Sequence, residues 1–436
     1  YPDTLYVDNL IGSDTVNTVP PAALDAFIDH GKVELTLEKD AELAISQLEA
    51  LNSLGIDLNV ITRVLQDEGV AAFENSFISL MESLSRKVSQ LQVANTEFSA
   101  NLGGIQGKVD EAMREIENDQ VLKRIWEKDY TLWKNEPAEI TNRLGWLDIA
   151  ERMKTALPEL DKFVSDIRRD GFASALLLGM GGSSLAPEVF RETFGVREGY
   201  LDLRVLDSTD PETIRTQAAN LDLSKTLYIV STKSGGTVET ISLFKYFYNQ
   251  LLAALGGEDP GSHFIAITDA GSQLDQIATD FHFRRIFHND PNIGGRYSAL
   301  SHFGLVPAAL IGVDLDDLLN RAVSIDMNHA AHLGATMAEL ALAGRDKLSL
   351  LISPGIASFG NWVEQLIAES TGKDGRGILP VVSEPVNQAR FYGNDRFFVY
   401  LKLKGATDFD QLAADLEQAG YPVVRMQMSS TYDLGK

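Results

Sequence analysis

Short, continuous apolar runs are the feature that most constrains how this chain folds. From Phe172 onward, such runs alternate with helical patterns. A strand that is apolar on both sides must be covered on both sides, which is typical of parallel sheets flanked by helices. The first runs are Ala175–Leu178, Leu203–Leu206, Leu227–Val230 and Phe264–Ile267. The sequence therefore predicts an α/β fold with a doubly wound parallel sheet.

A second group of apolar runs predicts a second sheet of the same kind. These runs are Leu348–Ile352, Phe397–Leu401 and Pro422–Met426. Because the sequence stops at Lys436, soon after the last run, we expect this second sheet to be truncated. The two sheets define two predicted domains, residues 171–330 and 331–436.

The chain before these sheets is predicted to be mostly helical. Residues 1–92 contain one strand candidate, Leu5–Val7, and four helical patterns, of which the third runs from Asp57 to Gly69. The fourth has one apolar face, formed by Phe73, Phe77, Leu80, Met81, Leu84, Val88 and Leu91. Residues 93–170 form a second helical stretch with three tryptophans, which we expect in a core or an interface: Trp126, Trp133 and Trp146.

Composition excludes several classes of protein. The chain has 436 residues, 44% of them hydrophobic, which is enough for a large core and two or three domains. Its net charge of −24 argues against nucleic-acid or anionic-membrane partners. The absence of cysteine excludes disulfides and thiolate chemistry, and the longest apolar run, near 303–313, is too short to span a bilayer. We therefore expect a cytoplasmic protein that binds anions, if at all, through a local cluster.

A strand–loop–helix segment provides such a cluster. The run Leu227–Val230 leads into residues 231–240, which are rich in Ser, Thr and Gly, and a helical pattern follows. Backbone N–H groups at a helix start bind anions, and glycine lets the backbone approach a ligand. The side chains that would add donors are Thr232, Lys233, Ser234 and Thr237. The alternative is an ordinary capped turn, since the same residue types favour turns.

Two glycine loops are further candidates for ligand contact. The loop Gly179–Ser183 follows a buried strand, which predicts a ligand-facing turn. A dinucleotide fingerprint would require glycine where Ser184 stands, so NAD binding is the weaker interpretation. The loop Gly294–Ser298 contains Arg296, which either approaches a ligand or lies on the surface.

A carboxylate near the end of a predicted helix completes the set. Glu369 lies in the last turn of a helix that ends near Gly372. The negative end of the helix dipole predicts a raised pKa, which suits a general base working near neutral pH. The alternative is an exposed glutamate at a helix end.

In this order, the four segments resemble phosphoglucose isomerase, a family built from two sugar-isomerase domains. The resemblance extends from about Ala100 to Lys436. It implies interconversion of glucose 6-phosphate and fructose 6-phosphate without a cofactor or metal. Glu369 would carry the proton between C2 and C1 through an enediolate, and Arg296 would stabilise the oxyanion. The implied phosphate-binding residues are Gly182, Ser183, Thr232, Lys233, Ser234 and Thr237.

The N-terminal region resembles a different family. Residues 5–20 and Asp29–Gly31 are similar to the C-terminal part of a transaldolase, which in that family is the last strand and the closing helices of a (β/α)₈ barrel. The catalytic lysine of the family lies on an earlier strand, and no lysine precedes Lys32. We therefore expect no transaldolase activity from a chain that resembles natural transaldolase–isomerase fusion proteins.

The sequence also departs from the isomerase pattern. The family usually opens the sugar ring with a histidine after the base segment and a lysine near the C-terminus. No histidine follows His332, the terminal helix would lie beyond Lys436, and His302 is assigned a structural role. The family is commonly dimeric, so a homodimer is one expected assembly. The alternatives are a truncated isomerase with impaired activity, a non-catalytic sugar-phosphate sensor, and an inactive fragment of a bifunctional enzyme.

Overall fold

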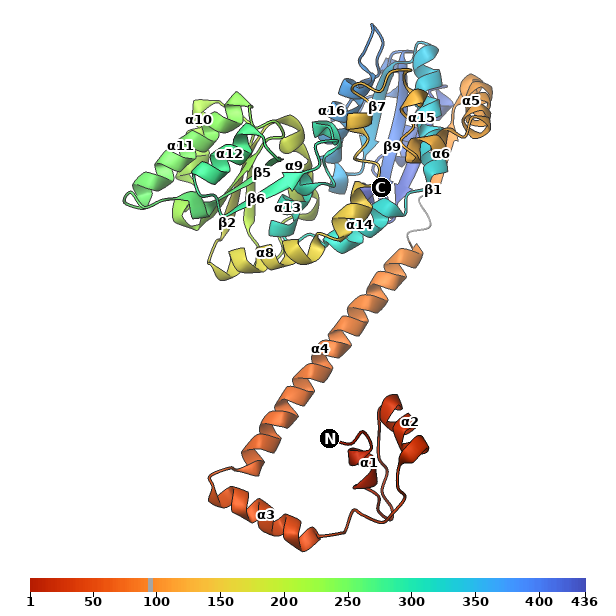
Figure 1. Ribbon diagram of the computed structural model, residues 1–436. Coiled ribbons are helices and arrows are strands. Elements are labelled where there is room, and N and C mark those ends of the chain that lie inside the picture. The colour runs from red at the N-terminus through yellow and green to blue at the C-terminus, as the bar shows by residue number, and fades with distance from the viewer. Residues whose placement is uncertain (93–96) are drawn as a thin grey trace. The chain divides into compact units, whose positions relative to one another are not determined.

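The computed structural model describes residues 1–92 and 97–436, except for the side chains of residues 75, 79, 82–92 and 97. The chain divides into two compact units, residues 1–85 and 86–436, which are described separately. Figure 1 labels most of their helices and several of their strands.

The N-terminal unit is helical. Its elements are α1 (Leu5–Asp8), α2 (Pro21–His30), α3 (Ala41–Ser53) and the start of α4 (Leu58–Gln92). The strand predicted at Leu5–Val7 is wrong, because this segment is the helical turn α1. The N–H groups of Val7 and Asp8 both donate to the carbonyl of Thr4, at 2.9 Å. With no other strand among residues 1–85 to pair with, the backbone satisfies its polar groups locally.

The two helices predicted after Asp57 are one continuous helix, α4, and Gly69 lies inside it. A glycine in a helix interior costs only about 1 kcal/mol relative to alanine, so it does not by itself end a helix. On the predicted apolar face, Phe73 is 82% and Phe77 63% exposed, while the side chains of 84, 88 and 91 lie outside the described residues. Neither α4 nor any other helix in the described part is both long and apolar enough to cross a membrane.

The first sheet of the second unit confirms the predicted parallel α/β fold. Its strand order is β3-β2-β4-β5-β6, and all pairs are parallel. The strands are β2 (Ser174–Gly179), β3 (Asp202–Leu206), β4 (Thr226–Ser231), β5 (Phe264–Asp269) and β6 (Arg285–Asn289). The sequence did not predict β6, because only two of the five residues of this edge strand are apolar and the strand is only partly buried.

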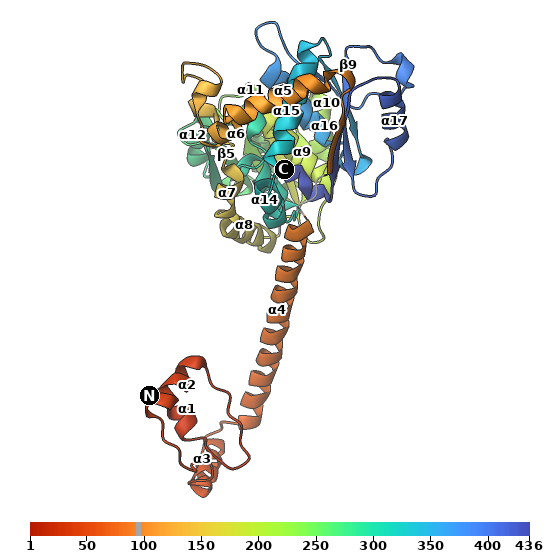
Figure 2. The same cartoon turned by 90° about the vertical axis from the view of Figure 1, so that its right-hand side faces the viewer.

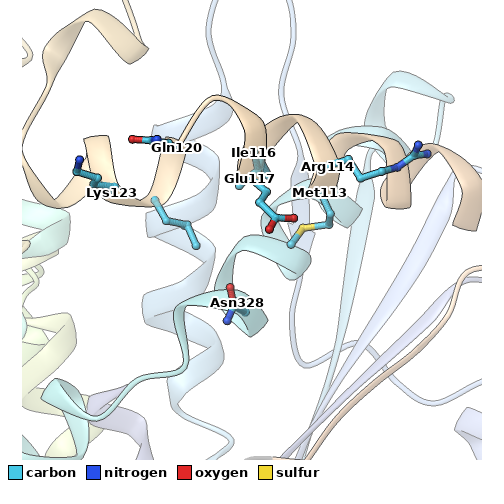
Figure 3. A pocket seen from close by; sticks show the side chains of 8 residues that line it. Met113, Arg114, Ile116, Glu117, Gln120, Lys123 and Asn328 are labelled. Atoms are coloured by element: carbon cyan, nitrogen blue, oxygen red, sulfur yellow. The ribbon is translucent and has the colours of Figure 1, made fainter.

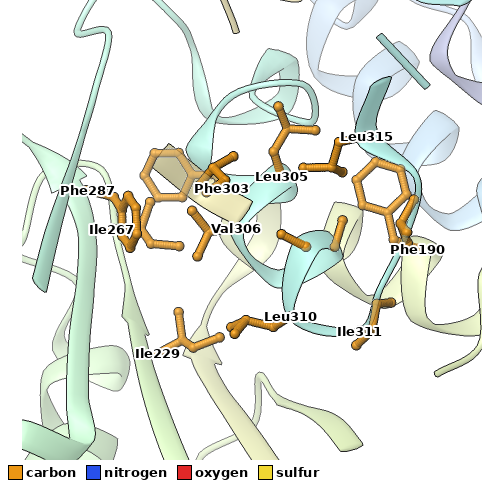
Figure 4. Packing of buried hydrophobic residues seen from close by; sticks show 14 of the residues in the cluster. Phe190, Ile229, Ile267, Phe287, Phe303, Leu305, Val306, Leu310, Ile311 and Leu315 are labelled. Atoms are coloured by element: carbon orange, nitrogen blue, oxygen red, sulfur yellow. The ribbon is translucent and has the colours of Figure 1, made fainter. Parts of the chain in front are cut away.

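Helices cover both faces of this sheet, which explains the continuous apolar runs. Side chains from alternate positions of one strand enter different cores: Ile229 packs in one cluster, and Tyr228 and Val230 in the other. The first face is covered mainly by α8 (Leu157–Arg169), α9 (Leu185–Phe194), α13 (His302–Leu310) and α14 (Leu315–Val323), and Figure 4 shows part of this packing. The other face of the sheet is covered by α10 (Pro211–Ala219), α11 (Val238–Ala254) and α12 (Gln273–Asp280).

The second sheet also has five strands in the described residues, in the order β1-β10-β9-β7-β8. They are β1 (Glu97–Asn101), β7 (Lys347–Ile352), β8 (Leu379–Val381), β9 (Arg396–Leu403) and β10 (Val423–Met428). The three predicted strands are confirmed, and β1 and the short β8 are additions. Strand β1 pairs antiparallel with β10, with Ala100 opposite Val424, so residues 93–170 are not wholly helical as predicted. The sequence of β1 contains no continuous apolar run, which is why this strand was not predicted.

Helices also lie on both sides of the second sheet. Figure 2 shows α17 (Asp410–Gln418) on one side and α15 (Met327–Leu342) with α5 (Gln106–Asn118) on the other, as the two hydrophobic clusters also indicate. The remaining helices are α6 (Val121–Trp126), α7 (Ile149–Lys154) and α16 (Phe359–Thr371). Helix α16 contacts β8 in this sheet and α9 beside the first sheet.

The three tryptophans of residues 93–170 are not core residues. Trp126, Trp133 and Trp146 are 46%, 47% and 37% exposed. Trp146 stacks on Tyr297, with ring centroids 5.2 Å apart. This contact brings the helical region next to the loop that carries Arg296.

The buried sheet gives a direct stability prediction. Leu177 in β2 is fully buried, so Leu177→Ala removes apolar contacts and leaves a cavity. We expect a loss of about 2–5 kcal/mol in the free energy of unfolding, measured by urea denaturation followed by circular dichroism. Leu342→Ala is the matched control, since Leu342 is 68% exposed, and it should change this free energy by less than about 0.5 kcal/mol. Equal effects of the two substitutions would contradict the observed packing.

Candidate active site

Two of the predicted loops follow neighbouring strands of the first sheet. The glycine loop begins where β2 ends at Gly179, and the Ser/Thr loop begins where β4 ends at Ser231. The hydroxyl of Ser231 donates to the backbone carbonyl of Ser183 at 3.5 Å. Because β2 and β4 are parallel neighbours, both loops lie at the same edge of the sheet, beyond the carboxyl ends of the strands, where open α/β sheets commonly bind ligands.

The Ser/Thr loop presents donors at the start of α11. Thr232 is buried, and its hydroxyl lies 2.8 Å from that of Thr237. Thr237 precedes the helix, but its side chain does not cap it. The first backbone N–H groups of a helix have no acceptor within the helix itself. Ser234 accepts a hydrogen bond from Gly236 N–H at 3.3 Å, so the loop forms a compact turn before the helix.

The first glycine of this loop is required for packing. Gly235 has φ of +71°, and a Cβ there would lie 2.3 Å from the backbone nitrogen of Leu274, at the start of α12. The sequence interpretation assigned this glycine to close approach of a ligand. In the structure, it lets the loop approach the next helix of the fold.

The loop Gly294–Ser298, here called the arginine loop, packs directly on the glycine loop Gly179–Ser183. A Cβ on Gly182 would lie 2.4 Å from the carbonyl oxygen of Gly295, which begins the 3-10 turn η7 (Gly295–Tyr297). Ser298 is buried and donates to that same carbonyl at 2.6 Å. The position of Arg296 therefore depends on the absence of a side chain at residue 182.

Glu369, in α16, meets Arg296 across this turn. Nη1 of Arg296 donates to one carboxylate oxygen of Glu369 at 2.7 Å, and Nε2 of Gln365 donates to the other at 2.9 Å. Lys373 donates to the backbone carbonyl of Glu369 at 2.7 Å. The structure thus brings together the predicted base and the predicted oxyanion-stabilising arginine, although they are 73 residues apart in sequence.

The predicted direction of the Glu369 pKa is wrong. The hydrogen bond from Gln365 is the main cause that lowers the pKa of this carboxyl below its usual value, and Arg296 and Lys373 act in the same direction against a partial desolvation. These donors outweigh the helix dipole, because they contact or lie near the carboxylate itself. Arg296 has a raised pKa: burial opposes the charge, but the bonds to Glu369 and Tyr297 favour it. Both groups are therefore charged at neutral pH.

Gln365 is a site residue to which the sequence interpretation gave no role. Its amide nitrogen lies 3.2 Å from where a Cβ on Gly181 would stand, so it lies beside the glycine loop as well as beside Glu369. The spacing of four residues on one helix was the available signal, since such residues are neighbours on a helix surface. Tyr297 adds another contact, with its hydroxyl 2.8 Å from that of Ser370.

Two predicted residues have partners that are already part of the fold. The Lys233 ammonium forms an ion pair with Asp269 and donates to the carbonyl of Pro291 at 2.9 Å. Nδ1 of His302 lies 2.9 Å from the backbone carbonyl of His288, and burial lowers the His302 pKa. These contacts agree with the structural role predicted for His302.

A separate cavity of about 450 Å³ lies at α5, α6 and the start of α15 (Figure 3). It is lined by Met113, Arg114, Ile116, Glu117, Gln120, Leu122, Lys123 and Asn328. None of the predicted site residues lines it. Within the described residues, no three His, Cys, Asp or Glu side chains are grouped as a metal site requires.

Comparison with known proteins gives two family matches. Residues 166–340 match the model of phosphoglucose isomerase, and residues 1–84 match that of transaldolase/fructose-6-phosphate aldolase. A probable glucose-6-phosphate isomerase from Methanococcus maripaludis is 30% identical over 329 residues, which cover 70% of this chain and 70% of that protein. The chain belongs to the phosphoglucose isomerase family. A glucose-6-phosphate isomerase from Citrifermentans bemidjiense is 31% identical over 60% of this chain and 50% of its own length.

Solved structures agree with the phosphoglucose isomerase fold. A hypothetical protein from Thermus thermophilus has a TM-score of 0.63 at 23% identity, covering 78% of this chain and 90% of that one. A glucose-6-phosphate isomerase from Chlamydia trachomatis has a TM-score of 0.54 at 20% identity, covering 77% of each chain. The chain therefore joins a transaldolase-like segment to a phosphoglucose isomerase region, as the sequence predicted. The family match ends before Glu369, whose role remains a prediction.

The Glu369 contacts predict a low carboxyl pKa. Nuclear magnetic resonance of carbon-13-labelled glutamate should give a titration midpoint below the usual 4.5, and Gln365→Leu should raise it by removing the hydrogen bond. Because the folded-state pKa is depressed, ionised Glu369 stabilises the folded chain above the unfolded-state pKa. That contribution is lost as the pH falls through the folded-state pKa. A midpoint at or above 4.5 in the unchanged protein would refute this assignment.

The contact between the glycine loop and the arginine loop predicts that Gly182→Ala destabilises the protein. The added methyl group meets backbone that must shift, and we expect a loss of about 1–3 kcal/mol in the free energy of unfolding. Gly334→Ala in α15 is the control, since a Cβ there meets nothing within 4 Å. It should stabilise the helix by about 0.5–1 kcal/mol. Urea denaturation of both variants tests the opposite signs.

Proposed function

We propose that this chain is a glucose-6-phosphate isomerase, an aldose–ketose isomerase that interconverts glucose 6-phosphate and fructose 6-phosphate. The contact between Glu369 and Arg296 beside the glycine loop carries the proposal. Membership of the phosphoglucose isomerase family supports the substrate class, since the relatives are named for this reaction.

The phosphate would bind at the edge of the first sheet. The donors available there are backbone N–H groups of the glycine and Ser/Thr loops and the neighbouring hydroxyls, which suits an anion. The residues assigned to this role are Gly182, Ser183, Thr232, Lys233, Ser234 and Thr237. Binding energy from the phosphate, which is remote from C1 and C2, would hold the reacting carbons in place.

Glu369 would act as the base. Its ionised carboxylate removes a proton from C2 of the aldose, and the electrons form an enediolate whose negative charge lies on O1. A proton moves from O2 to O1, and the resulting carboxylic acid of Glu369 returns its proton to C1 of the enediolate, which gives the ketose with its carbonyl at C2. Arg296 would stabilise the negative charge that develops on the oxygens. Its buried Nε–H has no acceptor among the described residues, and the guanidinium has further donors besides Nη1. No cofactor or metal takes part in this proton transfer.

The lowered pKa of Glu369 bears on how the base works. The same hydrogen bonds that keep the carboxylate ionised also make it a weaker proton acceptor. Substrate binding between Glu369 and Arg296 would replace their direct contact and raise the basicity of Glu369 towards the value that efficient transfer requires. The Glu369 side chain is 47% exposed, so it is accessible for such a rearrangement.

Three further assignments accompany this proposal. We infer that the protein forms a homodimer, as is common in the family, and that it acts in the cytoplasm. We also keep the predicted division into residues 1–92, 93–170, 171–330 and 331–436. Strand β1 supports one refinement of this division. Residues 97–101 belong with the last domain, because β1 lies in the same sheet as β7–β10.

Glu369→Gln tests the role of the base. We expect kcat to fall by about 10²- to 10⁴-fold, because the amide cannot accept the proton. The assay couples glucose 6-phosphate formed from fructose 6-phosphate to a dehydrogenase. Glu364→Gln is the matched control, because Glu364 is an exposed carboxylate on the same helix, and it should retain full activity.

The outcomes separate the alternatives. Turnover that survives Glu369→Gln unchanged would remove Glu369 from the mechanism. If the unchanged chain binds fructose 6-phosphate in calorimetry but does not turn it over, the sensor or the inactive-fragment interpretation replaces the isomerase. A chain that neither binds nor isomerises phosphosugars would refute the proposal.

A further inference from the structure

We propose that Asp269 is a positioning residue that neutralises Lys233, so that the phosphate site holds its ligand by N–H and hydroxyl donors rather than by a free positive charge. The inference deepens the proposed function, since it rests on the assignment of residues 232–237 to phosphate binding. It adds a residue outside the four candidate segments and predicts the sign of its effect on phosphate affinity.

The ion pair is built into the end of β5. Asp269 is the last residue of this strand, which lies beside β4 in the sheet, and one of its carboxylate oxygens accepts a hydrogen bond from the Lys233 ammonium. The side chains of Lys233 and Asp269 are 27% and 16% exposed, so water screens their attraction only partly. A second hydrogen bond, to the carbonyl of Pro291 at 2.9 Å, holds the ammonium on the side of the arginine loop.

The main chain of Lys233 is anchored by the same strand. The hydroxyl of Thr268 and the N–H of Asp269 both donate to the carbonyl of Lys233, each at 3.2 Å. Thr268 is fully buried. Both the backbone and the side chain of Lys233 are thus held by β5, and the ammonium would have to leave two partners to contact a phosphate.

Removing the lysine would be costly for Asp269. The other carboxylate oxygen of Asp269, Oδ1, is buried and accepts no hydrogen bond from the described residues. An unpaired buried charge is strongly unfavourable, so Asp269 requires the lysine. With the pair intact, Lys233 and Asp269 add no net charge to the loop, and the remaining donors are hydroxyls and backbone N–H groups.

A neutral pair would limit phosphate affinity. The isomerisation is reversible and both its substrate and its product carry the same phosphate, so tight binding of this group stabilises ground state and transition state alike. A free lysine would strengthen binding of every phosphosugar and of inorganic phosphate without accelerating proton transfer. Asp269 would therefore keep bound phosphosugars exchangeable.

The test is a double-mutant cycle, with inorganic phosphate as the probe in calorimetry. Asp269→Asn removes a negative charge near the site and frees the lysine, so the Kd for phosphate should fall about three- to tenfold. Lys233→Gln leaves Asp269 unpaired next to the anion, so the Kd should rise at least about tenfold. The double variant is again neutral, and its Kd should return to within about threefold of the original value.

Asp280→Asn is the charge-matched control. Asp280 is the last residue of α12 and accepts a hydrogen bond from Gln276, away from Lys233. This variant should leave the Kd for phosphate unchanged. In the coupled assay, Asp269→Asn should lower the KM for fructose 6-phosphate without raising kcat, which a purely structural role would not produce.

The possible results are distinct. If all three variants of the pair weaken phosphate binding, the ion pair only holds the loop in shape, and the inference is overturned. It is also overturned if Asp269→Asn leaves the Kd unchanged. If the unchanged protein binds no phosphate at all, the phosphate-binding part of the proposed function fails first.

Discussion

The close packing of the loops at one edge of the first sheet is the constraint on which the candidate site depends. Strands β2 and β4 end side by side, which places the glycine loop and the Ser/Thr loop together. The arginine loop lies on the glycine loop because Gly182 has no side chain to separate them. Helix α16 then brings Glu369 to Arg296. Each step requires the one before it, so the site is a property of the assembled sheet and its loops.

Charge pairing is the second theme of the site. Glu369 lies between Gln365 and Arg296, and Lys233 lies between Asp269 and a backbone carbonyl. Both ionisable groups therefore have a partner in the absence of a ligand. A substrate phosphate and a developing enediolate would each be recognised by donors that the fold has already oriented, which is how preorganised sites stabilise charge.

Much of the fold was predictable because burial on both faces leaves a strong signal in sequence. Strands such as β2 and β4 are apolar at nearly every position, since alternate side chains enter two different cores. Strand β1 escaped prediction because one of its faces is polar, and α4 was divided in two because Gly69 resembled a helix end. The segment Leu5–Val7 has strand-like residues but no partner strand in its unit, and it forms a helical turn.

The sequence by itself determined the class of fold, the two families that the chain joins, and the residue types gathered in the four candidate segments. These follow from local patterns, namely apolar runs, glycine turns and the order of motifs along the chain. Only the tertiary structure decided the protonation state and the partners of those residues. The helix dipole, visible in the sequence, predicts a raised pKa for Glu369, whereas donors from its own helix and from a loop 73 residues away lower it. The sequence also shows that Lys233 carries a positive charge. Its ion pair with Asp269 forms only because β4 and β5 are neighbours in the sheet. Electrostatic effects depend on distances in space, and a sequence gives only distances along the chain.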